Sequence, residues 1–272
     1  MNRLHTAVAQ CAGRPLLGAA LYFYDPIFLE MAALMGFQCV WIEMEHGHIT
    51  FAEAADLCRM ASGLRLLTLI RIADTRRENV LKACECAPDI LDVPMVDDAA
   101  TAGELVHFAQ YPPNGARGAF SISRALRYGL VNDLQAAQTK LNRELSLLVQ
   151  VETKEALANI EEIAAVPGVD IFVGPSDLAS SLGYPGKPAH PAVRDACRTI
   201  VSAARRHGKK VATMCAIADV SFWLEQGVEL LFVINDIAAL KTGAKMALDA
   251  VQQAIAAGDA TTEARFQPDG HR

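Results

Sequence analysis

Hydrophobic and polar positions follow two alternating patterns along the chain. Short apolar runs are typical of buried strands, and we expect them at Leu16–Leu21, Cys39–Ile42, Leu66–Ile72, Ile90–Val96, Leu145–Val151, Asp170–Val173, Lys210–Met214 and Leu230–Ile234. The intervening segments repeat apolar residues every three or four positions, which predicts helices at Pro26–Met35, Phe51–Ala61, Arg77–Ala87, Ala99–Gln110, Lys154–Val166, Pro191–His207 and Val220–Gln226. Strands that alternate with helices form parallel sheets, and eight of them favour a closed (β/α)8 TIM barrel over an open sheet.

The chain length fits this fold as one domain. The 272 residues are close to the roughly 250 that a TIM barrel uses, and neither an internal repeat nor a linker divides them. We therefore predict a single α/β barrel domain over residues 1–257, followed by a polar, flexible tail over 258–272.

Composition and charge exclude several classes of function. Formal net charge is -6 and no basic run stands out, so we expect no nucleic acid and no anionic membrane as partner. No apolar segment reaches the roughly 20 residues that span a bilayer, and we interpret Leu16–Phe23 as a first strand and not a signal peptide. Seven cysteines without a framework spacing indicate reduced thiols and a cytoplasmic protein.

Polar residues gather where the predicted strands end. The chemistry of a TIM barrel lies at the carboxyl ends of its strands, and the side chains there are Glu43, Glu45, His46, Arg71, Gln150, Glu152, Gly174–Asp177, Asn235 and Asp236. Acids, a base and an arginine on one rim favour an active site over eight strands that simply leave the core for water.

Glu152 and Asp177 end neighbouring predicted strands, so their carboxylates can meet above the barrel. Two close carboxylates repel unless they are protonated or bridged by a cation, and two oxygens with open positions suit Mg²⁺ or Mn²⁺. Co²⁺ is an alternative, because metal preferences overlap at oxygen sites. The competing interpretation is a pair of salt-bridged or solvated acids.

Three further features supply charge and proton transfer. Arg71 can hold a carboxylate or stabilise an enolate oxygen, although an ion pair with Glu43, Glu45 or Glu85 would explain it equally. His46 can move a proton near neutral pH, with a rim hydrogen bond as the alternative. The turn at 174–176 offers backbone N–H groups from Gly174 and Ser176, while Pro175 has none, and such a turn can bind a small carboxylate.

A metal, an arginine and a histidine around an anion-binding turn suit aldol chemistry on a 2-oxo acid. Such an acid can chelate a metal through its carboxylate and keto oxygens, and the metal and Arg71 then stabilise the enolate formed as a C–C bond breaks or forms. No glycine-rich nucleotide motif is present.

These motifs resemble the metal-dependent (class II) pyruvate aldolases, which include 4-hydroxy-2-oxoheptanedioate aldolase and the 2-keto-3-deoxy sugar-acid aldolases. The resemblance runs from about Leu17 to Ala247 and is carried by Glu45-His46, Ile70-Arg71, Val93–Val96, Tyr111–Gly118, Val149–Thr153 and Gly174–Gly183.

The resemblance implies a TIM barrel whose last helix is exchanged with, or packed on, a neighbouring subunit of a homo-oligomer, usually a hexamer. It also implies roles for particular residues. Glu152 and Asp177 look like the metal ligands, Arg71 like the residue on the keto oxygen, and His46 like the catalytic histidine. The substrate site would comprise Arg71, Gln150, Gly174, Pro175 and Ser176, with Trp41 and the loop of residues 111–130 shaping the aldehyde side.

The chain departs from the family pattern near this site. Glu43 stands where the family usually has Asp, and Glu85-Cys86-Ala87-Pro88 replaces Asp-x-Gly-Ala. The family's Asp at the second position commonly partners the catalytic histidine, so we expect Glu85 to take that catalytic role with a shifted proton relay. The end of strand eight, Phe232–Asp236, lacks the usual glycine-rich, hydroxyl-bearing pattern.

We therefore expect a divalent-metal-dependent carbon–carbon lyase that splits a 4-hydroxy-2-oxo acid into pyruvate and an aldehyde through a metal-bound enolate. One alternative is a C–C-forming synthase of the same family, which would condense an oxaloacetate- or pyruvate-derived enolate as citrate-forming enzymes of siderophore pathways do. Another is a non-catalytic binding protein, against which the presence of His46, Arg71, Glu152 and Asp177 counts.

Overall fold

The computed structural model describes residues 2–265, and side chains up to residue 256. Its strands form a closed barrel in which every neighbouring pair is parallel, in the order β1-β2-β3-β4-β5-β6-β7-β8 and back to β1. The strands are β1 Leu16–Leu21, β2 Cys39–Glu43, β3 Leu67–Arg71, β4 Ile90–Val93, β5 Ser146–Val151, β6 Val169–Val173, β7 Val211–Met214 and β8 Leu230–Asn235. The predicted (β/α)8 barrel is confirmed.

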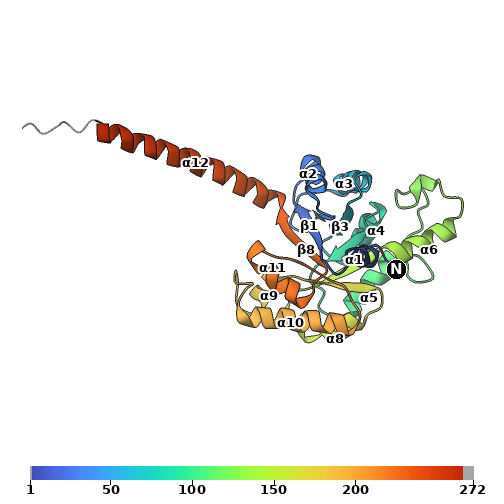
Figure 1. Cartoon of the computed structure of the whole chain (residues 1–272). Helices are drawn as coiled ribbons and strands as arrows, with labels where there is room; N and C mark the ends of the chain where they lie inside the picture. The colour runs from blue at the N-terminus through green and yellow to red at the C-terminus, as the bar shows by residue number, and fades with distance from the viewer. Residues whose placement is uncertain (1, 266–272) are drawn as a thin grey trace, which may run out of the picture.

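Helices cover the outside of this barrel (Figure 1). They are α2 Pro26–Met35, α3 Phe51–Gly63, α4 Arg77–Glu85, α5 Ala99–Ala109, α6 Leu134–Glu144, α7 Lys154–Ala158, α8 Ile160–Ala165, α9 Pro175–Ser181, α10 Pro191–Arg206 and α11 Val220–Gln226, with short 3-10 turns at Arg127–Gly129 and Ile217–Asp219. Two helices lie apart from this layer, α1 Arg3–Gln10 and α12 Asp236–Arg265. None of the helices described is long and apolar enough to cross a lipid bilayer.

Several boundaries differ from the sequence pattern for local reasons. The strand expected over Ile90–Val96 ends at Val93, because Pro94 has no N–H and Met95 takes a positive φ of 54°. The helix expected over Lys154–Val166 is broken at Asn159 into α7 and α8. Helices α1, α6, α9 and α12 were not predicted from periodicity.

Strand alternation creates two cores. Outward-facing residues such as Val40, Ile70 and Val149 pack against the helices in one cluster, and inward-facing residues form a second cluster within the barrel. At its centre the Trp41 ring contacts Phe172 and Phe232 edge-on, with ring centroids 5.2 and 5.1 Å apart.

Helix α1 closes the amino-terminal end of the barrel. The backbone N–H of Leu4 donates to Ser146 Oγ at 3.1 Å, and His5 Nε2 lies 2.9 Å from both carboxylate oxygens of Asp170. Arg3 forms an ion pair with Asp89. With this end closed, access to the barrel interior is left to the carboxyl end.

Helix α12 leaves the barrel instead of folding back onto it (Figure 1). It begins at Asp236, whose Oδ2 accepts from the backbone N–H groups of Tyr22 (2.8 Å) and Phe23 (3.0 Å). The helix continues past Gly258, where we had predicted the start of a flexible tail. The rest of that predicted tail, residues 266–272, lies outside the described residues.

Candidate active site

Strands β2 and β3 place a buried ion pair at the carboxyl end of the barrel. Their register sets Glu43 beside Arg71, so both side chains point inward from the same level. Arg71 Nε donates to Glu43 Oε2 at 2.6 Å, and Nη2 lies 2.5 Å from the same oxygen. Glu43 is fully buried and Arg71 nearly so, so the pair is held in one geometry.

The second oxygen of Glu43 organises the segment that follows β2. Its Oε1 accepts from the backbone N–H of Glu45 at 2.7 Å and of His46 at 2.9 Å. One carboxylate therefore fixes both Arg71 and the turn that presents His46. This explains why an acid ends the apolar strand: its charge is paired and its lone pairs are bonded.

Arg71 also contacts side chains from β5 and from the segment after β2. Its Nη1 donates to Gln150 Oε1 at 3.1 Å and lies 3.1 Å from Glu45 Oε2. The guanidinium stacks over the Trp41 ring, 4.7 Å from its centroid. The ion-pair alternative for Arg71 is thus present with Glu43 and Glu45, and the predicted neighbour Gln150 is present as well.

Glu152 follows β5 and is almost completely buried. Its Oε1 accepts from the backbone N–H of Met95 at 2.9 Å, and no described residue donates to Oε2. Burial raises the pKa of Glu152 to about 7; the Met95 N–H opposes this rise, and the nearby charge of Asp177 adds to it. That the two carboxylates meet above the barrel stays a prediction from the strand ends.

Gly174 leaves room for this carboxylate. A Cβ at position 174 would lie 2.2 Å from Glu152 Oε2 and 2.8 Å from Glu152 Cβ, so a larger residue could not stand there without displacing the side chain. Asp177 lies in the first turn of α9 and is exposed. A buried and an exposed carboxylate thus follow the neighbouring strands β5 and β6 at the carboxyl end of the barrel.

The donor set fits a hard divalent cation. Glu152 keeps one oxygen free of protein bonds, Asp177 is open to solvent, and oxygen ligands with open positions suit Mg²⁺ or Mn²⁺. Among the described residues no group of three or more His, Cys, Asp or Glu side chains forms a complete metal cage. Any cation held here would keep positions for water and substrate.

His46 and Glu85 occupy different surroundings. The His46 side chain is 62% exposed, and its Nε2 lies 3.7 Å from Glu45 Oε2. Glu85, at the end of α4, accepts a hydrogen bond from Arg117 Nη2 at 3.0 Å. In the part of the chain that the structure describes, no hydrogen bond or ion pair joins His46 to Glu85, so their predicted partnership within one chain has no contact to support it.

Trp41, Asn235 and Asp236 have mainly structural roles at this end of the barrel. Trp41 is 2% exposed and lies beneath Arg71, so its direct contact at the rim is with the arginine. Asn235 accepts from the backbone N–H of Ala238 and Asp236 holds the end of β1, which accounts for the unusual end of strand eight.

The sequence interpretation missed Asp92. This residue lies within the apolar strand β4, is fully buried, and faces Arg71 in the strand register. An acid in the middle of an otherwise apolar run was the available signal.

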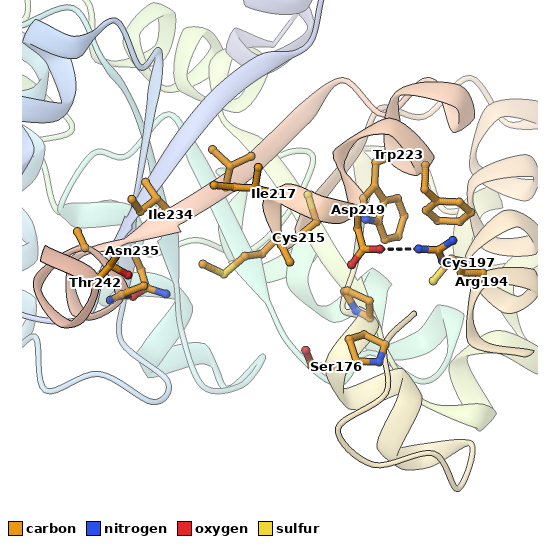
Figure 2. A pocket seen from close by; sticks show the side chains of 18 of the residues that line it. Ser176, Arg194, Cys197, Cys215, Ile217, Asp219, Trp223, Ile234, Asn235 and Thr242 are labelled. Carbon is orange, nitrogen blue, oxygen red and sulfur yellow. Dashed lines mark hydrogen bonds and ion pairs between the residues drawn. The ribbon is translucent and has the colours of Figure 1, made fainter. Parts of the chain in front are cut away.

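A cavity of about 690 Å³ flanks the site. Ser176 and Asn235 line the part of the cavity nearest the carboxyl end of the barrel. The cavity continues between α10, α11 and α12, where Arg194 forms an ion pair with Asp219 at 2.5 Å (Figure 2). It lies beside the carboxylates and not over them.

Comparison with known proteins identifies relatives of this chain. The family model described as HpcH/HpaI aldolase/citrate lyase matches residues 21–229. A hydroxypyruvate/pyruvate aldolase of Sagittula stellata is 36% identical over 72% of this chain and 76% of its own. A 5-keto-4-deoxy-D-glucarate aldolase of Klebsiella pneumoniae is 30% identical over 93% and 97%.

Solved structures agree with this comparison. A HpcH/HpaI aldolase/citrate lyase family protein from Burkholderia cenocepacia has a TM-score of 0.85 at 29% identity, covering 93% of this chain and all of its own. The citrate synthase SbnG has a TM-score of 0.81 at 24% identity, covering 93% and 98%, a likeness of fold alone.

Proposed function

Because the chain belongs to the HpcH/HpaI aldolase/citrate lyase family, we propose that it is a divalent-metal-dependent aldolase, which cleaves a 4-hydroxy-2-oxo acid to pyruvate and an aldehyde. Its relatives are named aldolases, so it is a carbon–carbon lyase. The observation that supports this reaction is the orientation of Arg71. Hydrogen bonds to Glu43 and Gln150 hold its guanidinium at the same end of the barrel as Glu152 and Asp177.

Glu152 and Asp177 would hold Mg²⁺ or Mn²⁺, with Co²⁺ as an alternative, and the cation would supply Lewis-acid stabilisation of negative charge on the substrate oxygens. Arg71 is oriented before substrate binds, because Glu43 fixes its Nε and Nη2. Its charge can therefore stabilise the keto oxygen as negative charge develops there, without reorganisation at the moment of reaction.

The remaining roles are proton transfer and orientation. We assign His46, exposed at the rim on a turn fixed by Glu43, to take the proton of the substrate 4-hydroxyl. The backbone at Gly174–Ser176 would orient the pyruvate carboxylate, with Gln150 holding Arg71 from β5, two strands along the barrel. Glu85 stays a prediction, and its bond to Arg117 favours a role in holding the loop of residues 111–130.

The test is pyruvate release from a panel of 4-hydroxy-2-oxo acids, measured in EDTA and again after Mn²⁺ or Mg²⁺ is added. We expect metal-restored release, lost in Glu152→Gln and in Asp177→Asn. Glu155→Gln is the matched control, because this acid lies on the adjacent helix α7 outside the site. Turnover that persists in EDTA, or in both ligand variants, would refute the metal assignment.

The same experiment separates the condensing alternative. Oxaloacetate alone, and then with an added aldehyde, is incubated with the enzyme and the products are identified. Release of pyruvate from a hydroxy-oxo acid supports cleavage, whereas a new condensed acid from oxaloacetate would make the synthase the correct function.

We also propose that the enzyme is a homo-oligomer, with a hexamer expected from the family resemblance, in which α12 packs on a second copy. The helix projects from the barrel (Figure 1) and exposes a set of apolar side chains, Ile237, Leu240, Met246, Leu248, Val251 and Ile255. The cavity beside the start of α12 (Figure 2) is lined by apolar residues including Ile217, Phe222 and Trp223, which suits a helix of this kind.

Light scattering after size exclusion tests the assembly. We expect Leu248→Glu to reduce the oligomer, while Lys245→Glu, an exposed polar position on the same helix, leaves the mass unchanged. A monomeric wild-type protein would refute the exchange.

A cytoplasmic location is proposed from the seven free cysteines, and localisation of a tagged chain checks it.

A further inference from the structure

A carboxyl group that the mechanism above does not use lies inside the barrel. Asp92 is fully buried in β4, between Leu91 and Val93, which belong to the outer core. By strand alternation its side chain therefore points into the barrel. Among the described residues nothing donates to or accepts from either of its carboxyl oxygens.

A second buried polar atom without a partner belongs to the residue beneath Arg71. Trp41 Nε1 is buried and no described residue accepts from it, although an indole N–H normally finds an acceptor when buried. The guanidinium of Arg71 stacks on the Trp41 ring, 4.7 Å from the ring centroid, and the Arg71 Cα pairs with that of Asp92 in the β3–β4 register. Both residues are therefore neighbours of Arg71, Trp41 through its ring and Asp92 through strand pairing.

Charge balance argues that Asp92 carries a proton. Arg71 is already paired with Glu43 and lies 3.1 Å from Glu45 Oε2. Burial raises the pKa of Asp92 well above its usual range; Arg71 opposes this, while Glu152, Glu43 and Glu45 add to it. A further unpaired anion in this interior would be costly, whereas a neutral acid can both donate and accept a hydrogen bond.

We propose that Asp92 is a positioning residue for Arg71: a neutral carboxylic acid that, together with the indole N–H of Trp41, binds one internal water molecule at the floor of the active site. A buried polar atom left unsatisfied is destabilising, and a buried water commonly bridges such groups with about two to four hydrogen bonds. Asp92 can donate to the water or accept from it, and Trp41 can donate to it.

This inference rests on the proposed function, because its consequence concerns the oxygen that Arg71 binds. A polar floor keeps the guanidinium at the height that Glu43 and Gln150 define, so that it meets the substrate without tilting. An apolar floor would leave the Trp41 N–H unbonded and let the arginine shift, which should weaken binding of the 2-oxo acid more than it slows the later steps.

The test compares Asp92→Leu, which is apolar and similar in size, with Asp92→Asn, which is neutral and can still bond water. Pyruvate is titrated into Mn²⁺-loaded wild-type and variant enzyme by calorimetry. We expect the dissociation constant for pyruvate to rise about tenfold in Asp92→Leu and less than about threefold in Asp92→Asn. KM should follow the dissociation constant, and kcat should change less. Thermal melts should show Asp92→Leu less stable than Asp92→Asn, because only the asparagine can still bond the water shared with Trp41.

Two results would overturn the proposal. One is that Asp92→Asn weakens pyruvate binding as much as Asp92→Leu does, which would mean that a negative charge is required; the other is that Asp92→Leu binds pyruvate as wild type does. A wild-type enzyme that binds no pyruvate would instead contradict the proposed function. In that event a crystal structure still decides the matter, since a water within hydrogen-bond distance of Asp92 and Trp41 Nε1 supports the proposal and its absence refutes it.

Discussion

Acidic side chains differ in their hydrogen bonding between the two ends of the barrel. At the amino-terminal end, Asp89 accepts from the Thr68 backbone N–H (2.8 Å) and hydroxyl (3.0 Å) as well as pairing with Arg3. Asp170 there meets His5 and accepts from the Lys210 N–H at 2.8 Å. At the carboxyl end, Glu152 has one backbone partner and Asp92 has none among the described residues.

This contrast teaches where a barrel can do chemistry. At the amino-terminal end, acids with both oxygens bonded hold α1 in place. Acids with free oxygens raise the energy of the empty site, and a cation or a substrate can relieve that cost when it binds. The carboxyl end is therefore organised for binding and the amino-terminal end for stability, as in barrel enzymes generally.

Replacing the arginine at each end should show the largest difference between the two ends of the barrel. Arg71→Ala is expected to lower turnover by about 10²–10³-fold, by analogy with loss of an oxyanion donor. It should also lower the free energy of unfolding by about 3–5 kcal/mol, because Glu43 is left buried without its partner. Steady-state kinetics and urea unfolding measure the two effects.

Arg3→Ala is the control, since the Arg3 side chain is 53% exposed and surface pairs contribute about 0–1 kcal/mol. Equal losses of stability in the two variants, or full activity in Arg71→Ala, would show that the two ends do not differ as described.

The next largest effect should come from the glycine that makes room for Glu152. Gly174→Ala puts a methyl 2.2 Å from Glu152 Oε2, so the carboxylate must move, and displacements near 1 Å can cost about 10²-fold in rate. Gly103→Ala is the control, because this helical position in α5 has nothing within 4 Å of an added Cβ. It should be active and more stable by about 0.5–1 kcal/mol. Unchanged metal-dependent turnover in Gly174→Ala would contradict the assigned role of Glu152.

The smallest effect concerns pH and follows from the pKa of Glu152, raised by burial to about 7 from 4.5. The folded protein then holds this proton more tightly than the unfolded chain. The stabilisation is complete below about pH 4.5 and is lost as pH rises through about 7, amounting to about 3 kcal/mol at most. Thermal melts in EDTA between pH 5 and 8 should show a steeper fall for wild type than for Glu152→Gln.

Added Mn²⁺ sharpens this measurement, because the metal binds the ionised carboxylate. We expect the rise in melting temperature on adding Mn²⁺ to grow from pH 5 to pH 7.5 in wild type and to be absent in Glu152→Gln. A metal effect that is independent of pH would show that Glu152 is not the group being titrated.

Much of this molecule was predictable from local sequence. Helix α2 has the bounds Pro26–Met35 that its apolar spacing predicted, with Asp25 capping its first turn and Gly36 ending it in a left-handed conformation. The rim residues Glu43, Arg71, Glu152 and Asp177 were found by counting strands, since strand ends and residue types are local properties. Periodicity could not locate α1, whose Leu4 is buried only because it packs against the barrel floor.

The interactions within the site were decided by the tertiary structure. Which acids would pair with Arg71 was open among Glu43, Glu45 and Glu85 until the structure placed Glu43 and Glu45 beside it, Glu43 through the β2–β3 register. Two further contacts also depend on residues from different parts of the barrel: Gly174 lies close to Glu152, and Trp41 lies beneath Arg71. The lack of a described partner for Asp92 is likewise visible only in the folded barrel. A sequence states which groups a strand carries, but closure and register of the barrel determine which of them share one buried volume, and this sharing sets their charges and partners.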